Sequence, residues 1–268
     1  MRLLLVITFS ILTIILPSIV KAQDVAEADT VDMGILLLRE KSANIMLHTL
    51  GYGLGFRFGT NKTYYKSRMF EFDLLEMRSP TQARSWNTNL PNTRSYFYGK
   101  LNNLYIIRAG VGQQHLMNRK PYWGGVELRA FYYGGVDLGL AKPNYLYIAY
   151  WTVDTINPGR AILDRTELER YDPEKHFPDI GTNSTTLSNI YGRGPMLSGF
   201  NKIKLYPGLY FKGGFNFEFS AANDRIKAVE IGATIDIFPN PVPIMAFKKE
   251  NYFFITGYLS FHLGKRYN

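Results

Sequence analysis

Residues 252–268 alternate strictly between apolar and polar side chains. Successive side chains of a β-strand point to opposite faces, so this segment has one apolar face and one largely polar face. In a soluble sheet the apolar face meets a core, whereas in a membrane barrel it meets lipid and the polar face points inward. The apolar positions are Phe253, Ile255, Gly257, Leu259, Phe261 and Leu263, and the opposite positions are Thr256, Tyr258, Ser260, His262 and Gly264.

The same two-residue period recurs along the chain and predicts an all-β fold. Most of the segments reach the roughly 9–11 residues that a tilted strand needs to cross a bilayer. Single-chain bacterial barrels have an even number of strands, with eight at the low end. We therefore expect a closed antiparallel transmembrane β-barrel of eight strands, with ten as the alternative. The expected strands are 47–58, 68–77, 104–114, 125–140, 144–152 (the weakest alternation), 204–220, 227–238 and 252–268.

A soluble barrel alternates in the same way, with its apolar face turned inward. Two features favour the membrane form. The first is glycine on the polar face, which suits a crowded lumen better than a solvated surface, at Gly51, Gly53, Gly55, Gly110, Gly112, Gly214 and Gly232. The second is a set of aromatic pairs near strand ends, typical of an interfacial girdle, at Tyr64–Tyr65, Tyr122–Trp123, Tyr150–Trp151 and Tyr252–Phe253.

The first 22 residues have the pattern of a secretory signal peptide. A positive Arg2 precedes an apolar run, and a small-residue exit ends at Ala22. We expect residues 1–22 to be this signal, 23–43 a periplasmic N-terminal segment, and 44–268 the barrel. A long extracellular loop is predicted at about 153–202, where Thr166 and Glu169 have capping-box spacing and predict a short helix over 166–171.

The composition restricts the function classes. The chain has no cysteine, which excludes a lipoprotein thiol, disulfides and thiolate metal sites. Its formal net charge is +9, and for an exported chain the anionic neighbour is lipid or lipopolysaccharide phosphate rather than nucleic acid. Beyond the signal segment there is no apolar run of the roughly 18 residues that a transmembrane helix requires.

Several motifs together resemble one family. The signal peptide ending in KAQ, the stretch GYGLGFRFG, the segment YGRGPMLSGFNKIKLYPGLYFK and the terminal LGKRYN look like small outer-membrane β-barrel proteins of Bacteroidota. The resemblance covers most of the chain after the signal peptide. It implies a barrel fold in the cell outer membrane, and it implies no reaction, because the family has none assigned.

The polar face of the predicted strands carries many charges. An eight-stranded barrel has an interior just wide enough for side chains, and buried charges must pair. We expect a plug of ion pairs, with a narrow ion or proton pathway as the alternative. The predicted lumen network comprises Arg57, Glu71, Asp73, Arg108, Glu127, Arg129, Asp137, Lys212, Glu218, Glu230 and Asp236.

No catalytic, cofactor or metal site is predicted. The GYGLG stretch lacks the spacing of a nucleotide-binding loop, because Phe56 occupies the place of the third glycine. Ser260 and His262 lie two apart on one strand face, as the Ser and His of outer-membrane lipid A deacylases do. By parity, however, both face the lumen, away from lipid acyl chains. The remaining histidines are not at metal-ligand spacing.

Parity also predicts where the short turns lie. We expect 59–68, 117–124 and 239–250 to be extracellular and to hold lipopolysaccharide phosphate through a basic rim, formed by Lys62, Lys66, Arg68, Arg119, Lys120, Lys248 and Lys249. The alternative is a rim that is basic only for solubility.

The predicted function is a non-enzymatic outer-membrane barrel with a structural, binding or accessory role in the envelope. The alternatives are first a narrow porin and second a lipid A acyl hydrolase. The expected partners are outer-membrane lipid, lipopolysaccharide and envelope proteins.

Overall fold

The structure is a computed structural model that describes residues 37–268, except for 64, 88–91, 120–124, 154–160, 173–188, 221–223, 247 and 249. The predicted signal peptide 1–22 and most of the predicted segment 23–43 lie outside the described residues. None of the described residues forms a helix with the length and hydrophobicity needed to cross a bilayer.

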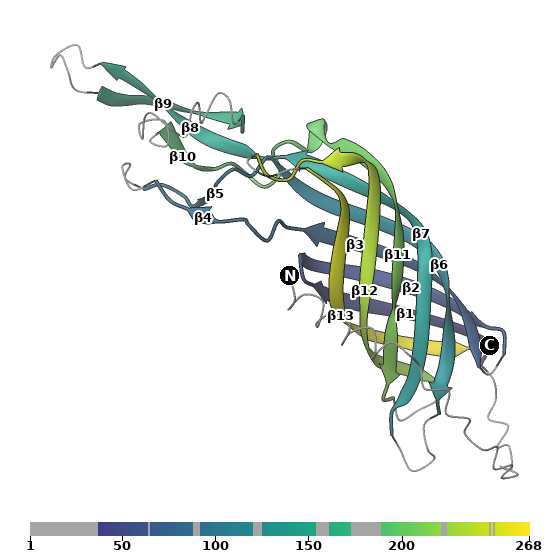
Figure 1. The fold of residues 1–268 in the computed structure, drawn as a ribbon. Helices are drawn as coiled ribbons and strands as arrows, with labels where there is room; N and C mark the ends of the chain where they lie inside the picture. Colours follow the sequence, from purple (N-terminus) through teal and green to yellow (C-terminus); the bar gives the residue numbers. More distant parts are fainter. Residues whose placement is uncertain are drawn as a thin grey trace, which may run out of the picture. The chain divides into compact units, whose positions relative to one another are not determined.

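Eight strands form a closed antiparallel barrel, which confirms the predicted fold class (Figure 1). Around the barrel the order is β1-β13-β12-β11-β7-β6-β3-β2. The barrel closes where β1 pairs with β13, from Arg39 opposite Tyr267 to His48 opposite Tyr258. The strands are β1 (Arg39–His48), β2 (Gly51–Asn61), β3 (Lys66–Met77), β6 (Asn102–Asn118), β7 (Glu127–Pro143), β11 (Lys204–Glu218), β12 (Arg225–Val242) and β13 (Asn251–Tyr267).

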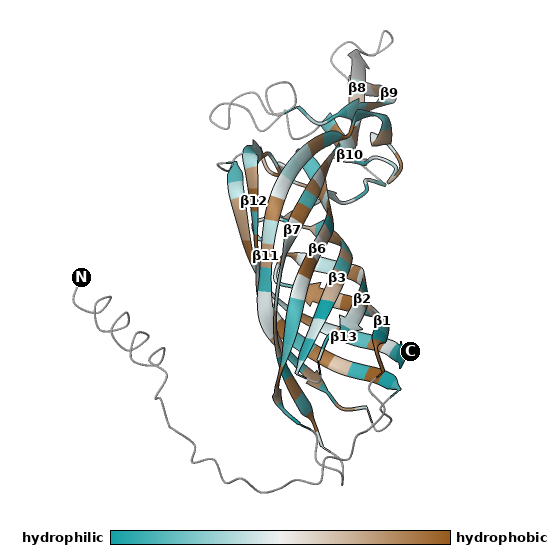
Figure 2. Cartoon of the chain, turned by 90° about the vertical axis from the view of Figure 1, so that its right-hand side faces the viewer, coloured by the Kyte–Doolittle hydropathy of each residue, from teal (hydrophilic) through white to brown (hydrophobic). Residues whose placement is uncertain are grey.

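The polarity of this barrel is the reverse of that of a soluble protein. On β13, Phe253 and Ile255 are 61% and 62% exposed, whereas Thr256 and Ser260 are 1% and 2% exposed. Exposed apolar side chains also face outward on other strands, such as Leu54 on β2 and Leu209 on β11, and Figure 2 shows hydrophobic and hydrophilic bands along the barrel strands. Large apolar side chains therefore cover the outside, and the inside holds the polar and charged side chains together with a buried apolar cluster that includes Met77, Leu104 and Phe238. An apolar exterior around buried charges is the arrangement expected of a barrel in lipid.

The barrel has two distinct ends. The end at which β1 begins and β13 finishes also carries the short connections 62–65, 119–126 and 219–224, and we call it the terminal end. The opposite end, the loop end, carries the tight connection 49–50, the two long connections 78–101 and 144–203, and the connection 243–250.

Both long connections contain further strands. The first includes β4 (Arg84–Ser85) paired with β5 (Tyr96–Phe97). The second holds a three-stranded sheet in the order β10 (Ile190–Arg193), β8 (Tyr145–Val153), β9 (Ala161–Arg170), and a short 3-10 helix, η2 (Phe200–Lys202). They share an apolar cluster, which we call the loop-end cluster: Tyr96, Leu146, Ile148, Tyr171 and Ile190.

The barrel has eight strands, as predicted, but one predicted strand lies outside the barrel and one barrel strand was not predicted. The segment 144–152 forms β8, which pairs with β9 and β10 outside the barrel. The eighth barrel strand is instead β1, which begins at Arg39 inside the predicted periplasmic segment 23–43. The helix predicted over 166–171 is also wrong, because these residues belong to β9 and its end. Pairing with β8 supplies backbone partners that a lone capping box cannot.

Candidate functional site in the barrel lumen

A buried ion-pair cluster occupies the middle of the lumen. Arg57 on β2 donates two hydrogen bonds to Glu230 on β12, at 2.5 and 2.7 Å, and one to Glu71 on β3 at 3.1 Å. Tyr258 and Asn216 donate to the same Glu230 carboxylate at 2.7 and 3.3 Å. The Arg57 side chain is only 1% exposed, and both carboxylates are fully buried. Charges buried this deeply persist because each is paired and hydrogen-bonded.

A second cation extends the cluster from β11. Lys212 donates to Glu71 at 3.1 Å and to Asp73 at 2.9 Å, and the Tyr210 hydroxyl donates to Glu71 at 3.0 Å. The Lys212 ammonium also lies 4.9 Å from the centroid of the Tyr258 ring. Glu71 therefore receives hydrogen bonds from three side chains on two strands, β2 and β11, which fixes the position of its carboxylate in the lumen.

Arg108 and Asp236 form a separate bidentate pair. The guanidinium on β6 donates to the Asp236 carboxylate on β12 at 2.8 and 2.7 Å. Asp137 is the register partner of Arg108 on β7 and is 3% exposed. Neither of its carboxylate oxygens has a hydrogen-bond partner among the described residues. The lumen thus holds more carboxylates than cations at this level.

Glycines make room for the large lumen side chains. A Cβ at Gly110 would meet the Tyr210 hydroxyl oxygen at 2.2 Å, and one at Gly112 would meet the Tyr133 ring at 2.4 Å. A Cβ at Gly55 would meet the Asp73 carboxylate at 2.0 Å. Real Cβ atoms do not approach so closely, so these positions require glycine. The crowded lumen inferred from the glycine pattern is what these contacts describe.

A third group of charges lies near the terminal end of the lumen. Arg266 on β13 donates to Glu218 at 2.8 Å and to Glu40 at 3.1 Å. Arg129 pairs with Glu127 at 2.5 Å, and these two side chains are 12% and 16% exposed. This group stacks a second layer of ion pairs below the central cluster.

All eleven predicted network residues lie on inward positions, but they do not form a single network. Two of them, Glu127 and Arg129, pair mainly with each other at the terminal end. Sequence reasoning missed the aromatic members Tyr133, Tyr210 and Tyr258, and the terminal-end partners Glu40 and Arg266. Strand parity placed the tyrosines inside, but it carries no signal for contacts that cross the lumen.

The Ser260–His262 pair does not form a catalytic triad. Ser260 Oγ lies 2.9 Å from His262 Nε2, and the same nitrogen lies 3.6 Å from Glu230. In a triad the acid binds Nδ1 and leaves Nε2 to the serine. Here the Glu230 carboxylate is already held by Arg57, and Ser260 is 2% exposed. The hydroxyl therefore has neither an oriented base nor access to an acyl chain outside the barrel.

The predicted basic rim is divided between the two ends, which corrects that prediction. Lys62, Lys66, Arg68 and Arg119 lie at the terminal end, whereas Lys248 lies at the loop end with the long connections. The sequence prediction omitted β1 and counted β8 as a barrel strand. The omission assigned the first turns to the wrong end of the barrel, and the extra strand restored the correct end for the last turn. Lys120 and Lys249 lie outside the described residues.

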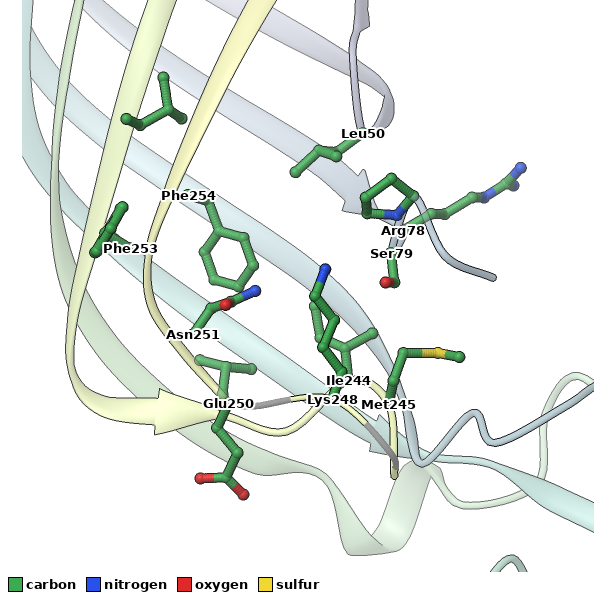
Figure 3. Close-up of a pocket in the computed structure, with 13 residues that line it drawn as sticks. Leu50, Arg78, Ser79, Ile244, Met245, Lys248, Glu250, Asn251, Phe253 and Phe254 are labelled. Carbon is green, nitrogen blue, oxygen red and sulfur yellow. The ribbon is translucent and has the colours of Figure 1, made fainter. Parts of the chain in front are cut away.

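A cavity of about 200 Å³ opens at the loop end of the lumen. It is smaller than the roughly 300 Å³ at which ligand pockets usually start. Figure 3 shows the Lys248 side chain directed among the lining residues and the Glu250 carboxylate directed away from them. Its walls come from the connections 49–50, 78–101 and 243–250 and from the adjoining ends of β12 and β13, and they include Leu50, Ser79, Ile244, Phe253 and Phe254.

Lys100, in the connection after β5, is a buried cation outside the barrel strands. It is 4% exposed, and its ammonium lies 5.1 Å from the centroid of the Phe97 ring. Burial is the largest effect and lowers the pKa of Lys100 to about 8, while the Glu76 carboxylate opposes the change. No set of three or more His, Cys, Asp or Glu side chains within the described ranges is placed to hold a metal ion.

Comparisons with known proteins gave matches among solved structures and none among family models or curated proteins. Among solved structures, neisserial surface protein A matches with a TM-score of 0.36 and 6% identity, over 85% of this chain and 96% of that one.

Two further solved structures match at a similar level. The N-terminal β-barrel domain of Pseudomonas aeruginosa OprF has a TM-score of 0.34 and 8% identity, over 85% and 97% of the two chains. The attachment invasion locus protein Ail of Yersinia pestis has 0.35 and 8%, over 86% and 97%. At these similarities the strand register of the chain itself carries the fold assignment. The resemblance to Bacteroidota barrels stays a prediction.

Proposed function

We propose that the chain is an integral outer-membrane β-barrel without enzymatic activity, which holds a folded binding surface at its loop end. The observation that carries the proposal is the inverted polarity of a closed barrel. Phe253 and Ile255 face outward while Arg57, Arg108 and Lys212, each at most 1% exposed, face inward. An aqueous environment would penalise that exterior, and closed barrels are the β-structures that cross membranes.

The orientation proposed for the barrel follows from the lengths of its connections. In bacterial barrels the short turns are periplasmic and the long loops extracellular. The terminal end therefore faces the periplasm and the loop end the exterior. This orientation places the sheet of β8, β9 and β10 outside the cell.

The binding role rests on the exposed sheet at the loop end. β9 lies at its edge, and its described side chains from Leu163 to Leu168 are exposed on both faces. A strand edge whose backbone is unpaired is a template for an added strand. The loop-end cluster stabilises this sheet, so it offers a preformed surface with little ordering cost. Envelope or extracellular proteins are the proposed partners.

The ion-pair plug argues against a diffusive porin. The central cations bridge strands on opposite sides of the lumen, with Arg57 reaching Glu230 and Arg108 reaching Asp236. A continuous water path would have to break these contacts, and each buried charge left without its partner would cost on the order of 3–5 kcal/mol. The geometry of Ser260 and His262 argues equally against the hydrolase.

Four measurements test the proposal. Folded protein should migrate faster than heated protein on a gel and should resist extraction from lipid vesicles at high pH. Planar bilayers containing it should show no steady conductance, and lipid A from cells that express it should keep its acyl pattern. A chain that stays soluble without detergent would refute the membrane assignment, and steady conductance would favour the porin.

A further inference from the structure

Three cations stand side by side on the outer wall of the barrel at its terminal end. Lys41 on β1 is directly opposite Lys265 on β13, and Lys265 is directly opposite Arg225 on β12. All three side chains are exposed, and the outward-facing Lys227 follows Arg225 by two positions. We call Lys41, Lys265 and Arg225 the basic row.

The basic row is unfavourable for an isolated barrel. Directly opposed residues in an antiparallel pair have Cβ atoms about 4.5–5.5 Å apart, and like charges there destabilise the sheet. Among the described residues, none of the three forms an ion pair. Glu40 and Glu218 do not relieve the repulsion, because they face the lumen and are held by Arg266, and the exposed Asp224 beside Arg225 forms no ion pair with the row among the described residues.

The surroundings of the basic row match one kind of ligand. Toward the middle of β13 the next outward residues are apolar and exposed, with Leu263 at 51% and Phe261 at 41%, and the Phe219 ring stacks on that of Phe261 with 6.3 Å between their centroids. At the outer edge, the Lys41 ammonium lies 5.3 Å from the centroid of the Tyr267 ring. Cations at the edge of an apolar wall fit a phosphate headgroup with its acyl chains along that wall.

We infer that the basic row binds the phosphate of an anionic phospholipid in the leaflet at the terminal end. The inference rests on the proposed membrane location and orientation, under which this leaflet is the periplasmic one. One phosphate with its several acceptor oxygens receives charge-assisted hydrogen bonds from neighbouring strands and removes their mutual repulsion. The lipid thereby ties β12, β13 and β1 together across the seam where the barrel closes.

A charge-removal variant tests the inference with the full chain. Lys41→Gln, Arg225→Gln and Lys265→Gln are combined, and the matched control combines Lys62→Gln, Lys66→Gln and Arg68→Gln. The control removes three cations from the same end, but Lys66 and Arg68 face His115, Gln113 and Thr60 rather than other cations. Phosphatidylglycerol binding to protein in phosphatidylcholine micelles is measured by native mass spectrometry.

The expected result is a selective loss of binding. Loss of the charge-assisted hydrogen bonds that the row makes to a single phosphate should weaken phosphatidylglycerol binding by at least about tenfold in the row variant, and the control variant keeps these bonds. The control should change by about twofold or less. In micelles without anionic lipid the row variant should unfold at the same or a higher temperature than wild type, because the repulsion is gone. Addition of phosphatidylglycerol should reverse that order.

Several outcomes would overturn the inference. Equal losses in both variants would reduce the row to general surface charge. Binding of lipopolysaccharide but not phosphatidylglycerol through the row would assign it to the other leaflet. If residues 24–32, with their four acids, had to be deleted before any lipid bound, the row would belong to this chain's own N-terminal segment. Heat-modifiable migration and vesicle insertion of the wild type are scored separately, because their failure would refute the membrane assignment rather than the lipid site.

Discussion

Replacement of Arg57 by methionine should lower the free energy of unfolding of the barrel by more than the removal of any other lumen ion pair that is tested in parallel. The change keeps an unbranched side chain but removes two bonds to Glu230 and one to Glu71. Among the described residues, Glu71 retains Lys212 and Tyr210, while Glu230 retains the donors Tyr258 and Asn216 and the more distant His262. Breaking one partner from a buried pair costs about 3–5 kcal/mol, and we expect a value in that range.

The assay is guanidinium unfolding of protein in lipid vesicles, followed by the loss of the fast-migrating folded band. The matched control is Arg129→Met, whose partner Glu127 is partly exposed, and which should cost about 1 kcal/mol or less. The double variant Arg57→Met with Glu230→Gln should recover at least about 2 kcal/mol of the single loss, since it removes the stranded charge. A cost below about 1 kcal/mol for Arg57→Met, or no recovery in the double variant, would refute the assignment of this pair as the centre of the plug.

Three further predictions follow from individual residues. Gly110→Ala should destabilise the barrel by about 1–3 kcal/mol, because the added Cβ would meet the Tyr210 hydroxyl. Gly257→Ala should be tolerated, because the nearest neighbour of its Cβ would lie at 3.8 Å. The temperature of the gel-mobility transition compares the two variants. Because the pKa of Lys100 is lowered in the folded state, the unfolded connection binds more protons between about pH 8 and 10.5. The free energy of opening this connection should therefore rise over that range and stay flat below pH 8. Hydrogen exchange of residues 97–102, corrected for intrinsic rates, should show this slope in the wild type and not in Lys100→Met. Ser260→Ala should leave the lipid A acyl pattern of expressing cells unchanged, and a changed pattern by mass spectrometry would restore the hydrolase.

The alternation of the strands was sufficient to predict a closed eight-stranded barrel but not which segments compose it. β1 escaped because both of its faces are polar over its first half, where Lys41 is exposed beside the buried Glu40 and Asn44. β8 was counted because its side chains are apolar, but Leu146 and Ile148 pack into the loop-end cluster rather than against lipid. A two-residue period reports which sides of a strand are apolar, and not which neighbour covers them.

The same limit applies to the lumen. Parity assigned Arg57, Lys212 and Glu230 to the interior, since charge on the inner face recurs at alternate positions. Their pairing depends on the stagger between strands on opposite sides of the barrel, which fixes the level at which each side chain stands. That stagger also determines why Asp137 stands opposite Arg108 while the guanidinium binds Asp236 instead. It is a property of the closed structure and leaves no local trace in the sequence.

The ion pairs across the lumen also have a kinetic consequence. Arg57 and Glu230 are 173 residues apart in the chain, Lys212 and Glu71 are 141 apart, and Arg108 and Asp236 are 128 apart. Each pair joins strands that are not neighbours in the sheet, so no hairpin and no open sheet can form it. These contacts arise together when the first and last strands meet, and folds dominated by such distant contacts form slowly. Closure should therefore be the slow step of assembly. Once closed, the barrel should open much more slowly than a single hairpin would dissociate from the lipid.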